Sequence, residues 1–371
     1  MKILLIILFS FIFNQEECQN GRYENEIFDV DVEYEVQYGQ NINETLFGSQ
    51  YTENLYMDIY SPREDDFNDR PLIFFLFGGS FIGGSKSNGD IVDLCTKYAK
   101  RGYIAVAIDY RLSQNLLFFN PNEENAYKAV LKAIHDLKAA IRYFRMDNQY
   151  NNQFKIDSNR IYAGGVSAGA IAVVNAAYLN EESEIPSFLL DDIDDLGGFE
   201  GLSGNLGYDS SFYGIVNLCG AIGDKNWIIV DDIPIVSMHG NQDDTIPYDD
   251  NLVTLFGLDM QVDGSYIIHQ TMLGFDNYSD LYTYENQGHT PFSSNMNLET
   301  EFTSSFLYEI VCSSDLISGD LNQDESLNIL DIIELVNLIL LNQYNELGDM
   351  NQDNYLNVVD IVLLVNIILS N

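Results

Sequence analysis

The chain has few positive charges. Its 371 residues contain 17 Lys and Arg against 57 Asp and Glu, which gives a formal net charge of −40. A field of that sign repels phosphate backbones and anionic lipid surfaces, so the composition excludes a nucleic-acid-binding protein. Hydrophobic residues make up 46% of the chain, which is typical of a folded protein. The length allows two or three domains.

Cysteines are also few, and their spacing is uninformative. Cys18, Cys95, Cys219 and Cys312 show no C-x-x-C spacing and no clustered histidine. The pattern therefore predicts neither a zinc site nor a redox motif. Four cysteines allow three disulfide pairings, and the sequence does not choose between them. Cys95 and Cys219 lie in apolar surroundings and are equally compatible with buried free thiols.

Long hydrophobic runs are missing throughout the chain. Lys2 precedes an apolar stretch at residues 3–13, which is too short to cross a bilayer comfortably, and polar residues follow at 14–17. This order predicts a signal peptide over residues 1–18, cut near residues 14–20, with a buried N-terminal strand as the alternative. We therefore expect a secreted protein without a membrane span in its mature form.

Short β-branched and aromatic runs alternate with helical stretches between residues 56 and 289. Strands are expected at residues 72–77, 104–108, 161–164, 213–218, 233–238 and 281–284. Apolar positions at helical spacing predict an amphipathic helix over residues 126–145. The alternation is typical of an α/β fold with a mostly parallel sheet. Polar residues 181–212 interrupt it and predict an insertion, either a lid or a solvated loop.

A Gly-Val-Ser-Ala-Gly motif at residues 165–169 lies between an expected strand and an Ala-rich helix. A sharp strand-to-helix turn needs small neighbours and leaves the serine hydroxyl exposed above the sheet. The helix N-terminus adds free N–H groups where negative charge develops during acyl transfer. We therefore predict Ser167 as a nucleophile rather than as part of a structural turn.

Glycines follow the first strong strand, at residues 78–79 and again at 83–84. Glycines there leave backbone N–H groups accessible to an oxyanion, because no side chain blocks the approach. Gly79 and Ser80, together with the Ala168 amide, are the expected oxyanion donors. A glycine-rich turn without a role is the alternative.

An acid and a base should follow the serine in the chain order Ser, Asp, His. Asp243 follows a strand end, with Asp244 as a fallback, and His289 follows the last strand after a glycine. Among the other histidines, His135 lies within the expected helix and is expected to be structural. His239 ends a strand beside the acid loop, where we expect a local hydrogen bond, and His269 has no adjoining glycine loop. His289 would accept the Ser167 proton, and Asp243 would orient its ring.

Residues 71–87 and 101–111, taken with these motifs, resemble the secreted carboxylesterases and lipases of the α/β-hydrolase superfamily. The resemblance covers about residues 30–312 and implies a catalytic domain over residues 19–312. It also implies a Ser-His-Asp triad and the oxyanion donors named above. Two positions depart from the family pattern, since Phe77 replaces a usual histidine and Ala170 replaces a frequent third glycine.

Two segments near the C-terminus, residues 319–340 and 348–369, align with each other at a period of 29 residues. Side-chain oxygens fall at positions 1, 3, 5, 9 and 12 of each copy: Asp320, Asn322, Asp324, Asn328 and Asp331, then Asp349, Asn351, Asp353, Asn357 and Asp360. This spacing predicts two 12-residue calcium loops of the EF-hand type. A helix is expected after each, at residues 330–341 and 359–369.

The tail resembles a type I dockerin, which implies a small all-α domain over residues 313–371 that binds calcium and docks onto a cohesin-type protein. Glu325 and Asn354 stand where the loop usually has Gly, and apolar residues occupy positions 329–330 and 358–359, where dockerins often carry recognition residues. A calcium-stabilised module docked on its own enzyme remains the alternative.

Together these features predict a secreted serine carboxylic-ester hydrolase without an organic cofactor. Short-chain or aromatic acyl esters are the expected substrates, including polysaccharide esters such as acetyl-xylan or feruloyl esters by analogy with dockerin-bearing enzymes. A peptidase, a polyester or lactone hydrolase, or a non-catalytic binding protein with a calcium-dependent tail are the alternatives.

Overall fold

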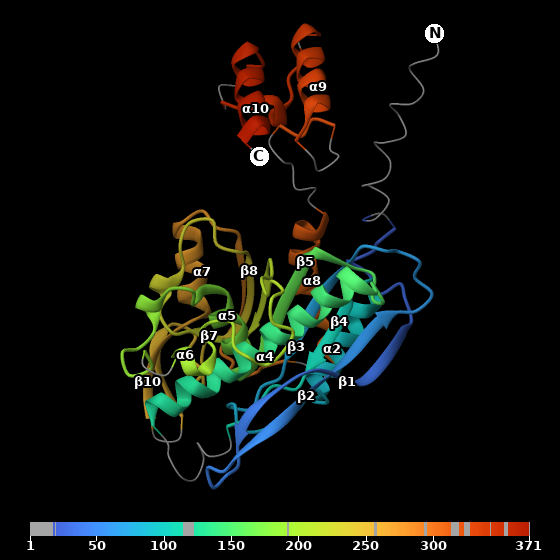
Figure 1. The fold of residues 1–371 in the computed structure, drawn as a ribbon. Helices are drawn as coiled ribbons and strands as arrows, with labels where there is room; N and C mark the ends of the chain where they lie inside the picture. Colours follow the sequence, from blue (N-terminus) through green and yellow to red (C-terminus); the bar gives the residue numbers. More distant parts are fainter. Residues whose placement is uncertain are drawn as a thin grey trace. The chain divides into compact units, whose positions relative to one another are not determined.

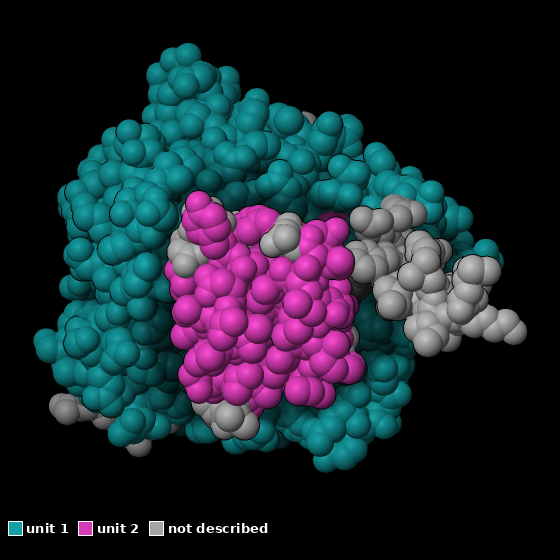
Figure 2. Space-filling model, turned by 90° about the horizontal axis from the view of Figure 1, so that it is seen from above, with its two compact units in different colours: residues 1–311 teal, residues 312–371 magenta. Residues whose placement is uncertain are grey.

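The computed structural model describes residue 18 and residues 20–113, 122–190, 193–255, 258–292, 295–312, 319–322, 327–341, 343–351 and 355–370. The expected signal peptide therefore lies outside the described residues except at Cys18. The chain divides into two compact units, Met1–Val311 and Cys312–Asn371, which Figure 2 shows in two colours. No helix in the described ranges is both long and apolar enough to cross a membrane.

Within the described residues, the larger unit is built on an eight-stranded sheet in the order β1-β2-β4-β3-β5-β6-β8-β11 (Figure 1). The strands are β1 (Val30–Glu44), β2 (Gln50–Pro62), β3 (Arg70–Leu76), β4 (Ile104–Ile108), β5 (Ile156–Val166), β6 (Ile215–Leu218), β8 (Ile235–Gly240) and β11 (Ser279–Tyr284). β1 and β2 pair antiparallel, as do β2 and β4, and all other neighbours are parallel.

The six strands expected from the sequence are all present in this sheet. Every residue of β3 and β4 is buried, which explains their continuous apolar runs. β1 and β2 were not predicted. β1 lies at the sheet edge with many exposed residues, so its sequence lacks the apolar run of a central strand.

Helices cover both faces of the sheet (Figure 1). α4 (Glu123–Tyr150) and α5 (Ala168–Tyr178) pack together on one face. On the other face, α2 (Gly89–Lys100) meets α8 (Asn297–Cys312), where the Tyr98 and Thr303 hydroxyls lie 2.8 Å apart. α4 begins before the predicted helix because the Asn122 side chain caps it, accepting from the Asn125 amide at 2.8 Å.

A small antiparallel sheet in the order β7-β10-β9 was not predicted. It consists of β7 (Ala221–Ile222), β9 (Asp250–Leu255) and β10 (Leu258–Gly264), and α7 (Ser265–Gly274) follows it. The 3₁₀ turn η3 (Lys225–Trp227) lies between β7 and β8. Exposed polar residues alternate with half-buried apolar ones in β10, a strand signal different from the continuous apolar runs of the central strands.

The insertion at residues 181–212 contains η2 (Glu182–Glu184) and α6 (Ile193–Leu196). Its second half is fastened to α4. A ring nitrogen of His135 lies 2.8 Å from the Gly198 carbonyl oxygen, and Arg142 donates to the Glu200 carbonyl at 2.9 Å. The segment is therefore anchored rather than a freely solvated loop.

Cys18 and Cys312 are disulfide-bonded, whereas Cys95 and Cys219 are buried free thiols. The structure thus realises the alternative in which Cys95 and Cys219 are buried free thiols rather than disulfide partners.

The smaller unit contains α9 (Ile329–Leu340), η4 (Glu346–Gly348) and α10 (Val358–Ser370), each helix starting one residue before its prediction. Leu335 and Leu364, which are 29 residues apart, are fully buried at the centre of its core together with Leu321 and Leu347. The sequence repeat is therefore also a repeat in packing.

Candidate active site

Ser167 lies at the turn between β5 and α5, with φ at 53° and ψ at −117°. A left-handed φ is unfavourable for a residue with a side chain. The turn is tight because a Cβ atom on Gly165 would lie 2.3 Å from the Gly169 carbonyl carbon, and one on Gly169 would lie 2.2 Å from the Leu76 carbonyl oxygen. Both motif glycines are therefore required by close backbone contacts.

The structure brings Ser167, His289 and Asp243 together from three loops at the carboxyl edge of the sheet. His289 Nε2 lies 2.9 Å from Ser167 Oγ, and His289 Nδ1 lies 2.6 Å from Asp243 Oδ2. The His289 side chain is 20% exposed, so the imidazole faces solvent where a substrate would enter. Asp244, the fallback acid, is exposed and takes no part in this arrangement.

The Asp243 carboxylate is fully enclosed and surrounded by donors. Oδ1 accepts from the Thr245 and Ile246 amides at 2.8 and 3.0 Å. Oδ2 lies near imidazole nitrogens of both His289 and His239, at 2.6 and 3.1 Å. Burial raises the Asp243 pKa, but the hydrogen bonds from the two histidines outweigh it and hold the pKa well below its usual range. The carboxylate is therefore ionised.

The predicted oxyanion donors lie against the nucleophile. A Cβ atom on Gly78 would lie 3.1 Å from Ser167 Cβ, so the glycine loop touches the serine. Gly79 and Ser80 both have left-handed φ values, 133° and 53°. Ala168 is the first residue of α5, where an amide has no acceptor within its helix. Within the described residues, none of these three amides donates a hydrogen bond to the protein.

Phe77, which departs from the family pattern, supports this loop. Its ring stacks on Tyr110 with centroids 4.2 Å apart, and the Tyr110 hydroxyl donates to the Phe77 carbonyl at 2.8 Å. An aromatic stack thus fixes the base of the glycine loop in place of the usual histidine.

The three remaining histidines have structural partners, as expected. His135 contacts Gly198, and His269 Nδ1 lies 2.9 Å from Ser279 Oγ. His239 is different, because its expected local hydrogen bond leads to Asp243. Sequence reasoning missed this contact, although the spacing of four residues between His239 and Asp243 was a signal for it.

A thiol also lies beside these groups. Cys219 Sγ, an Asp243 oxygen and a His289 nitrogen lie within 4.8 Å of one another. Burial raises the pKa of the Cys219 thiol to about 12, so it stays protonated at neutral pH. Cys219 therefore does not compete with Ser167 as a nucleophile.

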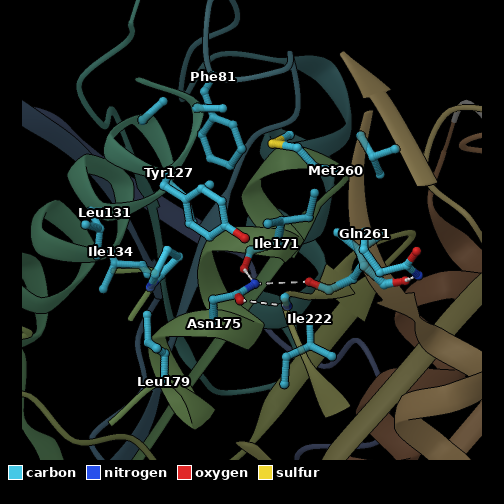
Figure 3. A pocket seen from close by; sticks show the side chains of 18 of the residues that line it. Phe81, Tyr127, Leu131, Ile134, Ile171, Asn175, Leu179, Ile222, Met260 and Gln261 are labelled. Carbon is cyan, nitrogen blue, oxygen red and sulfur yellow. Dashed lines mark hydrogen bonds between the residues drawn. The ribbon is translucent and has the colours of Figure 1, made fainter. Parts of the chain in front are cut away.

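A cavity of about 90 Å³ begins at Ser80 and Phe81 and extends between α4, α5, residues 184–189 and the small sheet. Figure 3 shows apolar side chains from these elements converging on it. The sequence did not predict this cavity, because its walls come from segments far apart in the chain.

Of the ten predicted calcium ligands in the tail, Asp324 and Asp353 lie outside the described residues. The described aspartates, Asp320, Asp331, Asp349 and Asp360, are all buried. The asparagines Asn328 and Asn357 cap the two helices, accepting from Leu330 and Val359 amides at 2.9 and 2.8 Å. Asn322 and Asn351 flank the buried aspartates in sequence.

Residues 57–220 match the BD-FAE family model. A structure of Thermogutta terrifontis esterase 2 phosphorylated by paraoxon aligns at 20% identity and a TM-score of 0.51, over 73% of this chain and 94% of that chain. A butyrate-bound structure of the thermophilic esterase from the same organism aligns at 19% identity and the same TM-score, over the same shares. These similarities, with the sheet order, confirm the predicted α/β-hydrolase fold.

Proposed function

We propose that the chain is a serine carboxylic-ester hydrolase that acts through an acyl-enzyme. The observation that carries this proposal is the continuous chain of short contacts from Ser167 Oγ through His289 to Asp243, at 2.9 and 2.6 Å. Unengaged amides beside Ser167 Oγ provide the second requirement, a place for the developing oxyanion.

In this mechanism Ser167 Oγ attacks the ester carbonyl carbon while His289 Nε2 takes the hydroxyl proton. The carbonyl oxygen becomes an oxyanion that accepts from the Gly79, Ser80 and Ala168 amides. As the tetrahedral intermediate collapses, His289 returns the proton to the leaving alkoxide and the alcohol departs. Water then attacks the acyl-enzyme with His289 as base, which releases the acid and restores Ser167.

We expect esters of short-chain or aromatic acids as substrates, including acylated polysaccharides. One structural neighbour is an esterase with bound butyrate, and another structure of that esterase is phosphorylated by paraoxon. Both descriptions fit a serine nucleophile that accepts a small acyl or phosphoryl group, and this is the class proposed for the present chain.

The test is hydrolysis of p-nitrophenyl acetate, butyrate and a long-chain ester by wild type and Ser167→Ala. We expect activity that Ser167→Ala abolishes and that His289→Gln also abolishes. His269→Gln is the matched control, because His269 contacts a serine but lies outside the triad, and it should keep wild-type rates. Equal rates from wild type and Ser167→Ala would contradict the proposal.

For the tail, we propose a calcium-binding module. Residues 313–371 contain ten Asp and Glu and no Lys, Arg or His. Four aspartates are nevertheless buried there, and Asp360 Oδ1 is a buried oxygen without a hydrogen-bond partner in the described structure. Backbone amides donate to Asp331 and Asp360, but residues 313–371 contain no cationic side chain that could neutralise the buried carboxylates, and hard oxygen ligands favour calcium. The donor set therefore fits the ion, which would neutralise these carboxylates when bound.

We also propose that this module docks onto a cohesin-type protein. Exposed apolar side chains recur at equivalent positions of the two helices: Ile329, Leu330 and Ile333 in α9, and Val358, Val359 and Val362 in α10. Exposed large apolar side chains gathered in this number on a small unit favour a protein partner. Capture of a purified cohesin by the full chain in calcium, lost when these positions carry Asp, would support the proposal. Equal capture by both forms would contradict it.

We propose that the protein is secreted. The disulfide of Cys18 and Cys312 supports this, because disulfides persist in oxidising compartments. It also supports cleavage of the signal peptide before Cys18, within the expected interval. N-terminal sequencing of the protein secreted by its own cells tests the site, and a mature chain that starts after residue 18 would contradict it.

A further inference from the structure

We propose that the cavity beginning at Ser80 binds the acyl group of the substrate and selects a hydrocarbon acyl group that is longer than acetyl and has no hydrogen-bonding substituent. This inference rests on the proposed function and narrows its substrate class. Ser80 supplies one expected oxyanion donor, and Ile171, also in the wall, donates its amide to the Ser167 carbonyl at 2.9 Å. The cavity therefore begins at the glycine loop, which touches Ser167.

The position of His289 assigns this cavity to the acyl side of the ester. His289 delivers a proton to the leaving oxygen, so the alcohol must lie on the side of His289. None of the described residues in 239–249 or 279–292, which carry Asp243 and His289, lines the cavity. The group that extends into it is therefore the part of the substrate that stays on Ser167.

The walls are aliphatic and aromatic. Figure 3 shows Leu131 and Ile134 of α4, Ile171 of α5, Ile222 of β7 and Met260 of β10 around the space. Apolar walls of this kind favour a hydrocarbon chain, and each methylene removed from water raises kcat/KM about fourfold.

Two polar side chains of the wall, those of Asn175 and Gln261, are already engaged in hydrogen bonds. Asn175 donates to the Ile171 and Ala221 carbonyls at 2.7 and 3.1 Å, and its oxygen accepts from the Gly223 amide at 3.1 Å (Figure 3). Gln261 donates to the Asn251 carbonyl at 3.1 Å. A substrate hydroxyl placed beside these two side chains would lose its bound water without an equivalent replacement.

Tyr127 lines the cavity and can be used to test whether hydroxylated acyl groups are excluded from it. Its ring meets Phe188 edge to face at 5.6 Å, and burial raises its pKa, so the phenol stays neutral. If the cavity selected a hydroxylated aromatic acid, the Tyr127 hydroxyl would be its recognition group, and Tyr127→Phe would remove the preference.

The experiment compares p-nitrophenyl acetate, butyrate, hexanoate and octanoate. For wild type we expect kcat/KM to rise about fourfold per methylene until the cavity is filled. Met260→Trp, which fills the cavity from β10, should lower kcat/KM for octanoate at least tenfold more than kcat/KM for acetate. Asp259→Trp is the matched control, because Asp259 is exposed on the same strand and does not line the cavity.

The second arm compares methyl cinnamate with methyl ferulate, which adds a hydroxyl and a methoxy group. We expect cinnamate to be the better substrate. A flat or falling chain-length profile, or a ferulate preference lost in Tyr127→Phe, would overturn the inference while Ser167-dependent acetate hydrolysis left the proposed function intact. Absence of any Ser167-dependent hydrolysis would overturn both.

A different set of contacts supports a second inference, which concerns His239 at the end of β8. His239 is fully buried, and its Nε2 lies 3.1 Å from both Asp243 Oδ2 and the Ile246 carbonyl oxygen. Both are acceptors, so Nε2 carries the proton. Nδ1 lies 2.7 Å from Ser265 Oγ, which itself accepts from Asn217 at 3.0 Å. The Ser265 hydroxyl therefore donates to Nδ1 and fixes the tautomer.

We infer that His239 is a positioning residue that holds the acid of the triad. It donates to the same Asp243 oxygen that His289 uses, while backbone amides fix the other oxygen. The carboxylate can then meet His289 in one orientation only. A hydrogen bond to the ionised carboxylate also moderates the charge that His289 experiences.

His239→Ala should lower kcat at least tenfold with KM unchanged, and should move the acid limb of the pH–rate profile to higher pH. His239→Gln keeps an N–H donor and should recover most of kcat, while Ser265→Ala should cause a smaller loss in the same direction. His269→Ala, which removes a histidine bonded only to a serine, is the control. An unchanged pH profile in His239→Ala and Ser265→Ala, or no recovery with Gln, would overturn the inference.

Discussion

The two compact units bury carboxylates in different ways. In residues 1–311, Asp136 is fully buried and lies 2.9 Å from the Arg111 guanidinium, and Asp243 lies between two imidazoles. In residues 312–371, Asp331 and Asp360 are equally buried, but this stretch contains no basic residue. The first unit therefore supplies its own compensating groups, whereas the second is expected to obtain its positive charge from an ion.

The largest expected difference between the two units is in kcat after one buried aspartate of each unit is replaced by asparagine. Asp243→Asn removes the group that orients His289 and should lower kcat about 10⁴-fold, because the imidazole can adopt the wrong tautomer. Asp360→Asn should leave kcat unchanged within twofold. Steady-state kinetics on p-nitrophenyl butyrate measures both. Comparable losses in the two variants would break the distinction between a catalytic carboxylate and a metal-binding one.

Calcium removal should separate the two units thermally. A chelator should lower the melting temperature of residues 312–371, since calcium at 1,000 times its Kd contributes about 4 kcal/mol. The single tryptophan, Trp227, lies in the larger unit and reports only on that unit. We expect a calcium-dependent transition in calorimetry that Trp227 fluorescence does not show. Identical melting with and without calcium would contradict the calcium site.

Removing the charge of the buried Asp136 carboxylate, which pairs with Arg111, should destabilise the first unit. Asp136 accepts from the Arg111 amide at 2.8 Å as well as from its guanidinium, and Ser203 also donates to it. Asp136→Asn leaves Arg111 buried beside a neutral group and should cost about 3 kcal/mol. Urea unfolding followed by Trp227 fluorescence measures this. Asp209→Asn, at an exposed pair with Arg145, is the control, and it should cost less than about 1 kcal/mol.

Acid between pH 6.5 and 4 should destabilise the first unit through one buried histidine. Burial lowers the pKa of His135 to about 4, whereas the unfolded chain has a pKa near 6.5. The unfolded state therefore binds the proton first, and stability present above pH 6.5 is lost as pH falls toward 4, by about 3 kcal/mol. Residues 312–371 contain no histidine. His135→Gln should flatten this dependence in Trp227-detected unfolding, and an unchanged slope would refute it.

The sequence predicted the parts of the fold that local pattern determines. β3 and β4 are buried throughout, so their apolar runs stand out, and Ser167 lies in a motif whose glycines are required by backbone contacts. β9 and β10 were missed because they lack the continuous apolar runs by which the central strands were predicted. The link from Ser265 to His239 could not be predicted, because it depends on how α7 packs beside β8.

The candidate site, like the fold, could be predicted where local sequence pattern determines it and could not be predicted where tertiary packing does. The order of serine, acid and base along the chain was sufficient to choose Ser167, Asp243 and His289, which the structure brings together. The acyl cavity could not be predicted from the sequence. Phe81, Ile171, Ile222 and Met260 come from separate elements, and only tertiary packing brings them together.

The most direct measurement for the central claim is titration of the full chain with paraoxon, followed by mass mapping of the labelled peptide. The account predicts release of one equivalent of p-nitrophenol per chain, a diethyl phosphoryl adduct on Ser167, and loss of ester hydrolysis in proportion to labelling. Ester hydrolysis that persists after complete treatment, or an adduct on another residue that accompanies its loss, would contradict the account.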